Sequence, residues 1–215
     1  MAQSSSAVFL DRDGVIIENR AAYVTSWADV EFLPTAFEAL RRLSRSAHRV
    51  VLVTNQSAVG RGLLTLEEAV ALNRRVIAEI EAHGGRVDAW YLCPHRPEQR
   101  CACRKPAPGM LRRAQQDLAL DLAQSYLVGD AIADVEAARA AGARGILVLT
   151  GRGHDQAARL ARENVAAPCP VVPDLAAALE YIAQATGGRG DEHSGHRSGR
   201  VHRERDHGAA VRARA

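Results

Sequence analysis

Short apolar runs rich in Val, Ile and Leu alternate along this chain with segments whose apolar residues recur at helical spacing. Strands that are buried on both faces carry such continuous apolar runs, so the alternation indicates a parallel sheet covered by helices on both sides. We therefore expect an α/β fold with a Rossmann-like parallel sheet. The predicted strands are Ala7–Leu10, Val50–Thr54, Val87–Leu92, Tyr126–Gly129 and Gly145–Leu149, with Pro170–Val172 as a weaker candidate. The predicted helices are Thr35–Ser46, Leu66–His83, Pro108–Ala119, Ile132–Ala141, Asp155–Arg162 and Leu175–Gln184.

The length of 215 residues suits one α/β domain, which we place at residues 1–186. Residues 187–215 hold seven Arg against four acidic residues and no aromatic residue, so we expect a disordered basic tail. The net charge of +3 lies wholly in this tail. The first residues lack a signal sequence and no stretch is long enough to span a membrane, so we expect a cytoplasmic monomer that makes no membrane contact.

The link between the first predicted strand and the first helix is unusually long. It covers residues 14–34 and contains Tyr23, Trp27 and Phe32. Long connections inside a compact domain usually serve a function. We predict a short flap over a binding site.

Polar side chains follow three of the predicted strands. Asp11 and Asp13 come after the first, Thr54 to Ser57 end and follow the second, and Asp130 follows the fourth. Ligands of open parallel sheets bind outside the carboxyl ends of the strands, and right-handed crossovers bring these ends to one edge. We therefore expect these side chains to meet in one site.

The carboxylates of this edge predict a magnesium site made by Asp11, Asp13 and Asp130. Asp11 and Asp13 are two positions apart and point to the same side of an extended chain. Closely paired carboxylates need a cation or a shared proton, and an all-oxygen ligand set suits Mg²⁺. The alternative is that these residues only form a turn, since Asp-Gly is a common turn dipeptide. A turn does not explain why Asp130 directly follows another strand.

The distribution of basic residues singles out Lys105, because it is the only Lys among 28 basic residues. All other basic residues are Arg, whereas Lys105 carries a compact ammonium and lies just before the start of a predicted helix. Together with the hydroxyl and amide donors of Thr54 and Asn55, it predicts a phosphate-binding site. The alternative is a solvated loop charge.

Three Cys and one His lie within eleven residues: Cys93, His95, Cys101 and Cys103. Three thiolates and one imidazole complete a tetrahedral zinc shell without an open position. We therefore predict a structural zinc loop, with reduced thiols that bind no metal as the alternative. The last ligand directly precedes Arg104 and Lys105.

Four motifs in this order resemble those of the haloacid dehalogenase-like phosphatases. They are Asp11-Arg12-Asp13-Gly14, Thr54-Asn55-Gln56, Arg104-Lys105-Pro106, and Gly129-Asp130 with Asp134. The resemblance covers residues 7–185 and is greatest to the branch that acts on heptose bisphosphates, with the histidinol-phosphate branch as a close relative; both branches carry the zinc loop. It implies a Mg²⁺-dependent phosphomonoesterase that removes the 7-phosphate of a heptose 1,7-bisphosphate, or alternatively the phosphate of histidinol phosphate.

The resemblance also implies roles for the motif residues. Asp11 would be the nucleophile that forms an aspartyl-phosphate, and Asp13 the acid and base, with its backbone carbonyl on the metal. Thr54 and Lys105 would hold the phosphoryl oxygens, and Arg104 would grip a distal anion. Further substrate contacts are expected from Asn55, Gln56 and Ser57 and from the flap residues Asn19, Arg20 and Tyr23. Some relatives carry Lys or Ser where this chain has Ala131.

A reading of another class is a zinc-stabilised binding module whose tail contacts nucleic acid. We favour the enzyme hypothesis, because a binding module does not explain the carboxylates at the strand ends. We therefore expect a small phosphorylated sugar, and not nucleic acid, as the ligand.

Overall fold

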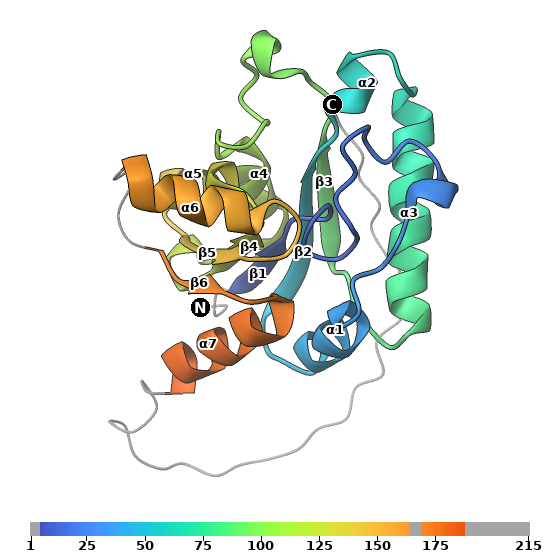
Figure 1. The fold of residues 1–215 in the computed structure, drawn as a ribbon. Coiled ribbons are helices and arrows are strands. Elements are labelled where there is room, and N and C mark those ends of the chain that lie inside the picture. Colours follow the sequence, from blue (N-terminus) through green and yellow to red (C-terminus); the bar gives the residue numbers. More distant parts are fainter. Residues whose placement is uncertain (1–4, 164–168, 188–215) are drawn as a thin grey trace.

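The structure is a computed structural model that describes residues 5–163 and 169–187 (Figure 1). In this part of the chain, six parallel strands form one sheet in the order β3-β2-β1-β4-β5-β6. The strands are β1 (Ala7–Leu10), β2 (Arg49–Asn55), β3 (Ala89–Cys93), β4 (Tyr126–Gly129), β5 (Arg144–Val148) and β6 (Val171–Val172). The predicted α/β class and all predicted strands are confirmed, the weakest as the two-residue β6.

The helices lie close to their predicted ranges. They are α1 (Ala36–Ser44), α3 (Leu66–Ala82), α4 (Gly109–Leu118), α5 (Ile132–Ala141), α6 (Gly153–Glu163) and α7 (Leu175–Gly187). A capping box begins α3, because the Thr65 hydroxyl accepts a hydrogen bond from the backbone N–H of Glu68 and the Glu68 carboxylate accepts one from the backbone N–H of Thr65. The short helix α2 (Ser57–Gly60) and the 3₁₀ turns η1 (Trp27–Asp29), η2 (Pro97–Gln99) and η3 (Leu122–Gln124) were not predicted.

Successive residues of β1 point to opposite faces of the sheet, and each face has its own hydrophobic core. Val8 and Leu10 pack in the core that includes residues of α1, α3 and α7. Ala7 and Phe9 pack in the second core, with residues of α4 and α5. Burial on both faces explains why β1 is apolar throughout.

The strand order reverses between β1 and β4. The chain builds outward from β1 through β2 to β3, then crosses back to place β4 on the other side of β1. This reversal opens a crevice at the carboxyl ends of β1 and β4, which is where open α/β sheets bind ligands. Asp11 follows β1 and Asp130 follows β4, so both stand at the crevice.

Residues 14–34 form a flap whose beginning and end are hydrogen-bonded to each other. The backbone N–H of Gly14 donates to the carbonyl of Ile17, and that of Leu33 donates to the carbonyl of Ile16. Trp27 packs beneath the guanidinium of Arg75 on α3, 4.0 Å from its ring centroid, and Figure 1 shows α3 beside the flap.

Other expectations concern parts that the structure does not describe. The predicted tail at residues 187–215 lies, apart from Gly187, outside the described residues. Within the described ranges, the helices are all too short or too polar to cross a membrane.

Candidate active site

Asp11 is the first residue after β1 and is buried, with 6% of the residue exposed. The backbone N–H of Asp11 donates to the carbonyl of Val128 in β4, which fixes the residue between the two central strands. Its Oδ1 accepts hydrogen bonds from the backbone N–H of Arg12 (2.8 Å) and lies 2.9 Å from the ammonium of Lys105.

Lys105 is almost fully buried at 3% exposure and pairs with two carboxylates. Its Nζ lies 2.9 Å from Oδ1 of Asp11 and 2.6 Å from Oδ1 of Asp134, and it donates to the carbonyl of Val53. Burial alone lowers a lysine pKa, but the attraction of Asp11 and Asp134 outweighs it and raises the pKa of Lys105. The only lysine of the chain is therefore a permanent positive charge in the site.

Asp13 stands at the edge of the site and is held by two side chains. Its carboxylate accepts from Nε of Arg12 (3.0 Å) and from Nε2 of Gln56 (2.9 Å), and Arg12 itself is fully buried. The same Nε2 also donates to the hydroxyl of Thr54. These hydrogen bonds fix the position of the Asp13 carboxylate at the edge of the site.

Asp130 is fully buried behind Asp11, and two glycines make room for its carboxylate. A Cβ at Gly14 or at Gly151 would overlap with its oxygens, and both glycines have positive φ. The carboxylate accepts from Nδ2 of Asn19 (3.2 Å), and from the backbone N–H (2.9 Å) and the guanidinium of Arg152. Asp130 therefore joins the flap and the loop after β5 to the site.

The carboxylates fit a hard divalent cation. One oxygen each from Asp11, Asp130 and Asp134 lies within 4.8 Å of the others, and all three residues are buried. Burial, together with the neighbouring carboxylates and against the pull of Lys105, raises the pKa of Asp11 to about 7. The pKa of Asp134 is raised for the same reasons. An excess of buried negative charge of this kind is what a bound cation relieves.

Two predicted contact residues hold the cationic loop in place. The side-chain amide of Asn55 accepts from the backbone N–H of Lys105 and donates to its carbonyl, both at 3.1 Å. The hydroxyl of Ser57 accepts from Nη1 of Arg104 at 2.7 Å, and the same nitrogen donates to the carbonyl of His95. These contacts fix the position of both cations relative to β2.

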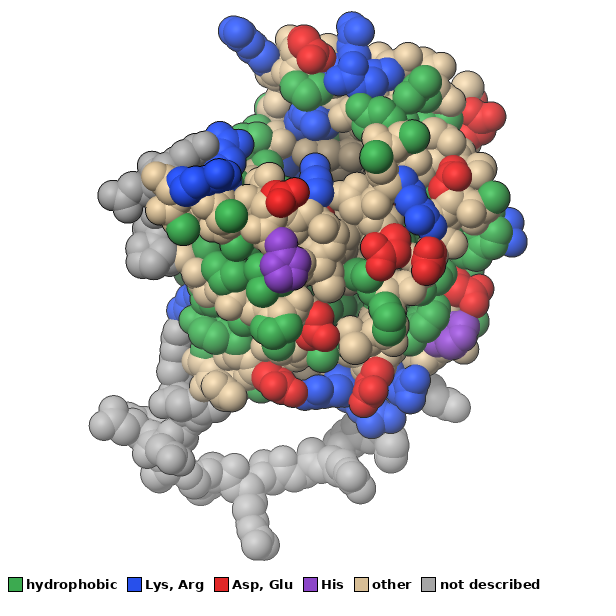
Figure 2. Space-filling model, in the orientation of Figure 1, with side chains coloured by type: hydrophobic (Ala, Val, Ile, Leu, Met, Phe, Trp, Pro, Cys, Tyr) green, Lys and Arg blue, Asp and Glu red, His purple; other side chains and the backbone are tan. Residues whose placement is uncertain are grey.

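A cavity of about 380 Å³ opens above these residues. In Figure 2, Lys and Arg side chains gather around a hollow in the upper half of the displayed face. The sequence-predicted residues that line it are Asp11, Asp13, Asn19, Arg20, Tyr23, Asn55, Gln56, Ser57, Arg104 and Lys105. Thr54 and Asp130 are buried behind its wall.

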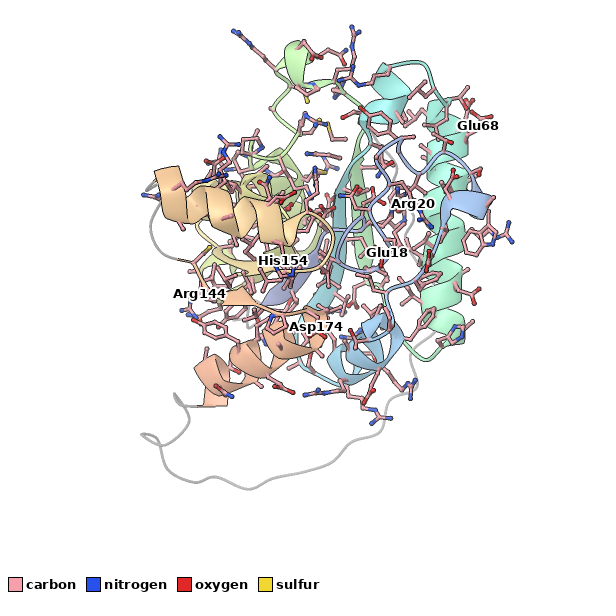
Figure 3. All side chains as sticks on the ribbon, viewed as in Figure 1. Glu18, Arg20, Glu68, Arg144, His154 and Asp174 are labelled. Atoms are coloured by element: carbon pink, nitrogen blue, oxygen red, sulfur yellow. The ribbon has the colours of Figure 1, made fainter. Side chains whose placement is uncertain are left out.

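The flap contributes less to this cavity than its aromatic content suggested. Tyr23 lines the cavity, whereas Trp27 and Phe32 do not. Phe32 packs against Phe37 instead, with ring centroids 4.5 Å apart. Arg20, labelled in Figure 3, reaches the cavity wall, but its guanidinium is bound by Glu31 at 2.9 Å.

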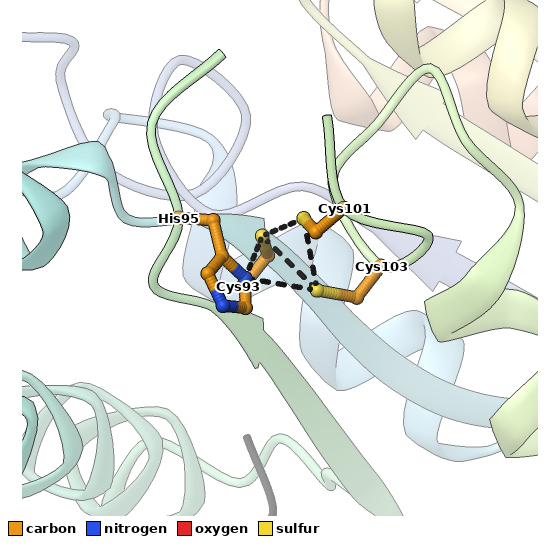
Figure 4. A group of neighbouring side chains, drawn as sticks. All are labelled: Cys93, His95, Cys101 and Cys103. Carbon is orange, nitrogen blue, oxygen red and sulfur yellow. Dashed lines mark hydrogen bonds between the residues drawn. The ribbon is translucent and has the colours of Figure 1, made fainter. Parts of the chain in front are cut away.

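The four predicted zinc ligands converge (Figure 4). The Sγ atoms of Cys93, Cys101 and Cys103 lie 3.3–3.5 Å apart, and Nδ1 of His95 lies 3.3 Å from that of Cys103 and 3.6 Å from that of Cys93. A tetrahedral zinc shell has ligand–ligand edges of about 3.5–3.8 Å, as its bond lengths require. Burial raises the pKa of the Cys93 thiol well above its usual range, so a cation is needed to keep it a thiolate. The cluster can therefore hold a metal ion of the zinc type.

Two residues of the site, Arg152 and Asp134, are not among the site residues predicted from the sequence. Asp134 lies in the first turn of α5, and its Oδ2 also accepts from the backbone N–H of Ala131. A signal for Arg152 was present, because Gly151 and Arg152 follow closely on the fifth predicted strand and so belong to the same edge of the sheet.

Comparison with known proteins agrees with this geometry. A family model described as HAD-hydrolase-like matches residues 102–178. The D-glycero-beta-D-manno-heptose-1,7-bisphosphate 7-phosphatase of Bordetella bronchiseptica is 39% identical over 177 residues, which cover 82% of this chain and 97% of the relative. The enzyme of the same name from Pseudomonas aeruginosa is 40% identical over 150 residues, 70% of this chain and 84% of the relative.

A solved structure has the same fold. It is the D,D-heptose 1,7-bisphosphate phosphatase from B. bronchiseptica complexed with magnesium and phosphate. The TM-score is 0.77 at 38% sequence identity, and the match covers 84% of this chain and 99% of the solved one.

Proposed function

The chain belongs to the haloacid dehalogenase-like phosphatases, and from this membership we propose that it removes the 7-phosphate of D-glycero-D-manno-heptose 1,7-bisphosphate. One observation carries the proposal. The carboxylate of Asp11 stands 2.9 Å from the ammonium of Lys105 at the buried end of a cavity large enough for a whole small molecule. A nucleophile and a phosphate-binding cation thus face the same ligand space.

In the proposed reaction, Asp11 attacks the phosphorus of the 7-phosphate. An oxygen–phosphorus bond forms on its carboxylate while the bond from phosphorus to the sugar oxygen breaks. Asp13, in its protonated form, gives a proton to the departing sugar oxygen. Water then attacks the aspartyl-phosphate, Asp13 accepts its proton, and inorganic phosphate leaves.

In this proposal Lys105 neutralises the phosphoryl oxygens and the hydroxyl of Thr54 helps to orient them during both steps, because phosphoryl transfer depends mostly on positioning and charge. Asn55 fixes the backbone of Lys105 through its two hydrogen bonds, and Asp134 fixes the ammonium. Asn19 and Tyr23 of the flap contact the sugar in this proposal.

Asp11, Asp130 and the backbone carbonyl of Asp13 are the proposed ligands of Mg²⁺. When bound, the ion withdraws charge from the phosphoryl group and keeps Asp11 ionised. Asp134 is the third carboxylate of this group but is already paired with Lys105 at 2.6 Å, so we assign it to the lysine.

Cys93, His95, Cys101 and Cys103 are proposed to hold a structural Zn²⁺. The loop that they close carries η2 and leads directly into Arg104 and Lys105. Metal binding would therefore fix the segment that delivers the two cations, at a stabilisation of roughly 10 kcal/mol.

The test is a panel of phosphate esters with and without Mg²⁺. We expect faster turnover of heptose 1,7-bisphosphate than of histidinol phosphate, with heptose 1-phosphate as the product identified by ³¹P NMR. Asp11→Asn should lose this activity while its circular dichroism spectrum stays that of the wild type. Faster turnover of histidinol phosphate would contradict the substrate and leave the chemistry intact.

A further inference from the structure

The cavity is larger than the reacting phosphate requires. Its volume of about 380 Å³ is in the range of sites that hold complete small molecules, roughly 300–1,000 Å³. Its buried end is formed by Asp11 and Lys105. Its exposed walls come from the flap, from η2 through Pro97, and from the end of α2 through Arg61. These walls face the part of a substrate that does not react.

Four arginines line the cavity, and three of them already have partners. The guanidinium of Arg20 pairs with Glu31 at 2.9 Å, and that of Arg152 pairs with Asp130 at 3.0 Å. Arg104 uses Nη1 on Ser57 and on a backbone carbonyl. An anion that binds Arg20 or Arg152 must therefore compete with a carboxylate.

The fourth arginine is Arg61, whose guanidinium makes no hydrogen bond or ion pair with any residue in the described ranges. It is exposed and directly follows the last residue of α2. Its guanidinium can bind an incoming anion without breaking an existing contact, in contrast to Arg20 and Arg152.

The backbone that carries Arg61 is fixed. The N–H of Gln56 donates to the carbonyl of Cys93 (2.7 Å), and the N–H of Gly60 donates to the carbonyl of Pro94 (2.9 Å). A Cβ at Gly60 would stand 2.9 Å from the same carbonyl oxygen, so α2 lies against the Cys/His loop. The backbone at Arg61 is already ordered, so binding an anion requires the ordering of this one side chain and not of a loop.

Arg61 and Arg104 stand at opposite ends of α2. Arg104 contacts Ser57, the first residue of the helix, and Arg61 follows the last, one turn or about 6 Å further along. The two guanidinium groups thus border the same wall of the cavity, beyond the buried Lys105.

We propose that Arg61 binds the second, non-reacting phosphate of the substrate and so determines the preference for a bisphosphate over a monophosphate. This inference rests on the proposed function. A guanidinium matches two phosphate oxygens at once, and a charged hydrogen bond of this kind contributes about 10- to 100-fold in affinity. The contact is the same in the ground state and the transition state, because this phosphate does not react.

The test compares Arg61→Gln with the wild type on heptose 1,7-bisphosphate and heptose 7-phosphate. For the bisphosphate, we expect KM to rise about 10- to 100-fold with kcat within about threefold, as for loss of a uniform binding contact. For the monophosphate, we expect kcat/KM to stay within about twofold of the wild type. Arg61→Lys should retain part of the preference, since it keeps the charge but loses the fork.

The matched control is Arg45→Gln, because Arg45 is also exposed, also follows the last residue of a helix in the same backbone conformation, and lies outside the cavity. It should leave both substrates unchanged. Equal effects of Arg61→Gln on the two substrates, or no effect on either, would overturn the inference. If the proposed function is wrong, the wild type will turn over histidinol phosphate faster than either heptose phosphate. Such a substrate has no second phosphate, so that result would also overturn the role of Arg61.

Discussion

The ammonium of Lys105 lies 2.6 Å from Oδ1 of Asp134, and both side chains are buried. The same ammonium lies 2.9 Å from Asp11, so one lysine balances two carboxylates at the buried end of the cavity. Removal of one partner of a buried ion pair leaves an uncompensated charge, which costs about 3–5 kcal/mol. Asp134 thus supports the site through the lysine that it holds.

We predict that Lys105→Met lowers the free energy of unfolding by about 3–5 kcal/mol and lowers kcat by about 10²–10³-fold. Urea unfolding and a phosphate-release assay measure the two effects. Adding Asp134→Asn to this variant removes one of the stranded charges, so the double variant should regain stability but no activity. A double variant that is no more stable than Lys105→Met would show that the pair is not coupled.

The raised pKa of Asp11 predicts how stability depends on pH without added magnesium. Burial and the neighbouring carboxylates raise this pKa from 3.8 to about 7. Between these values the folded chain binds more protons than the unfolded chain, so the free energy of unfolding contributed by Asp11 falls as the pH rises from about 4 to about 7. Asp134, whose pKa is also raised, acts in the same direction.

Thermal unfolding between pH 5 and pH 8 should therefore show a smaller fall in Tm for Asp11→Asn than for the wild type, because the amide does not titrate. Magnesium should raise the Tm of the wild type more at about pH 8 than at about pH 5, since it binds the ionised carboxylates. Parallel pH profiles for the two proteins would argue against a raised pKa at Asp11.

The sequence predicts the buried end of the site well, because apolar strands that stop at a carboxylate mark the edge of a parallel sheet. Asp11 and Asp130 are 119 positions apart, yet both follow central strands and their oxygens lie within 4.8 Å. The Cys/His loop is equally readable, since its ligands are close in sequence and only need to close on one another.

The exposed walls could not be predicted in this way. Helix α2 has four residues, too few for a helical period, and its position depends on the fit of Gly60 against Pro94. Only the folded structure shows that the other three cavity arginines have hydrogen-bond or ion-pair partners and that Arg61 has none among the described residues. The contact of Arg152 with Asp130 likewise depends on tertiary packing, because it needs Gly151 to lie against Gly14.

The Cys/His cluster predicts a difference between two cysteine substitutions. Cys101→Ser removes one of the converging ligands and should reduce bound zinc to near zero, measured by elemental analysis. We also expect kcat/KM to fall at least about tenfold, because the loop leads directly to Arg104 and Lys105. Cys169→Ser, a change to a cysteine outside the cluster, should retain both zinc and activity. Full activity of zinc-free Cys101→Ser would contradict a role for the loop in placing the two cations.

Alanine substitutions at two glycines with the same backbone conformation distinguish the effect of backbone strain from that of a steric clash with Asp130. Gly14 has φ +87° and Gly142 has φ +83°, so alanine at either costs about 1–2 kcal/mol of backbone strain. A Cβ at Gly142 meets nothing within 4 Å, whereas one at Gly14 overlaps with the Asp130 carboxylate.

Gly14→Ala should therefore lower kcat/KM at least about 10²-fold, because a small misplacement of a catalytic group has effects of that size. It should also raise the magnesium concentration that gives half-maximal activity. Gly142→Ala should show a similar loss of Tm from strain with activity within about twofold of the wild type. Equal activities of the two variants would mean that Asp130 does not need the space beside Gly14.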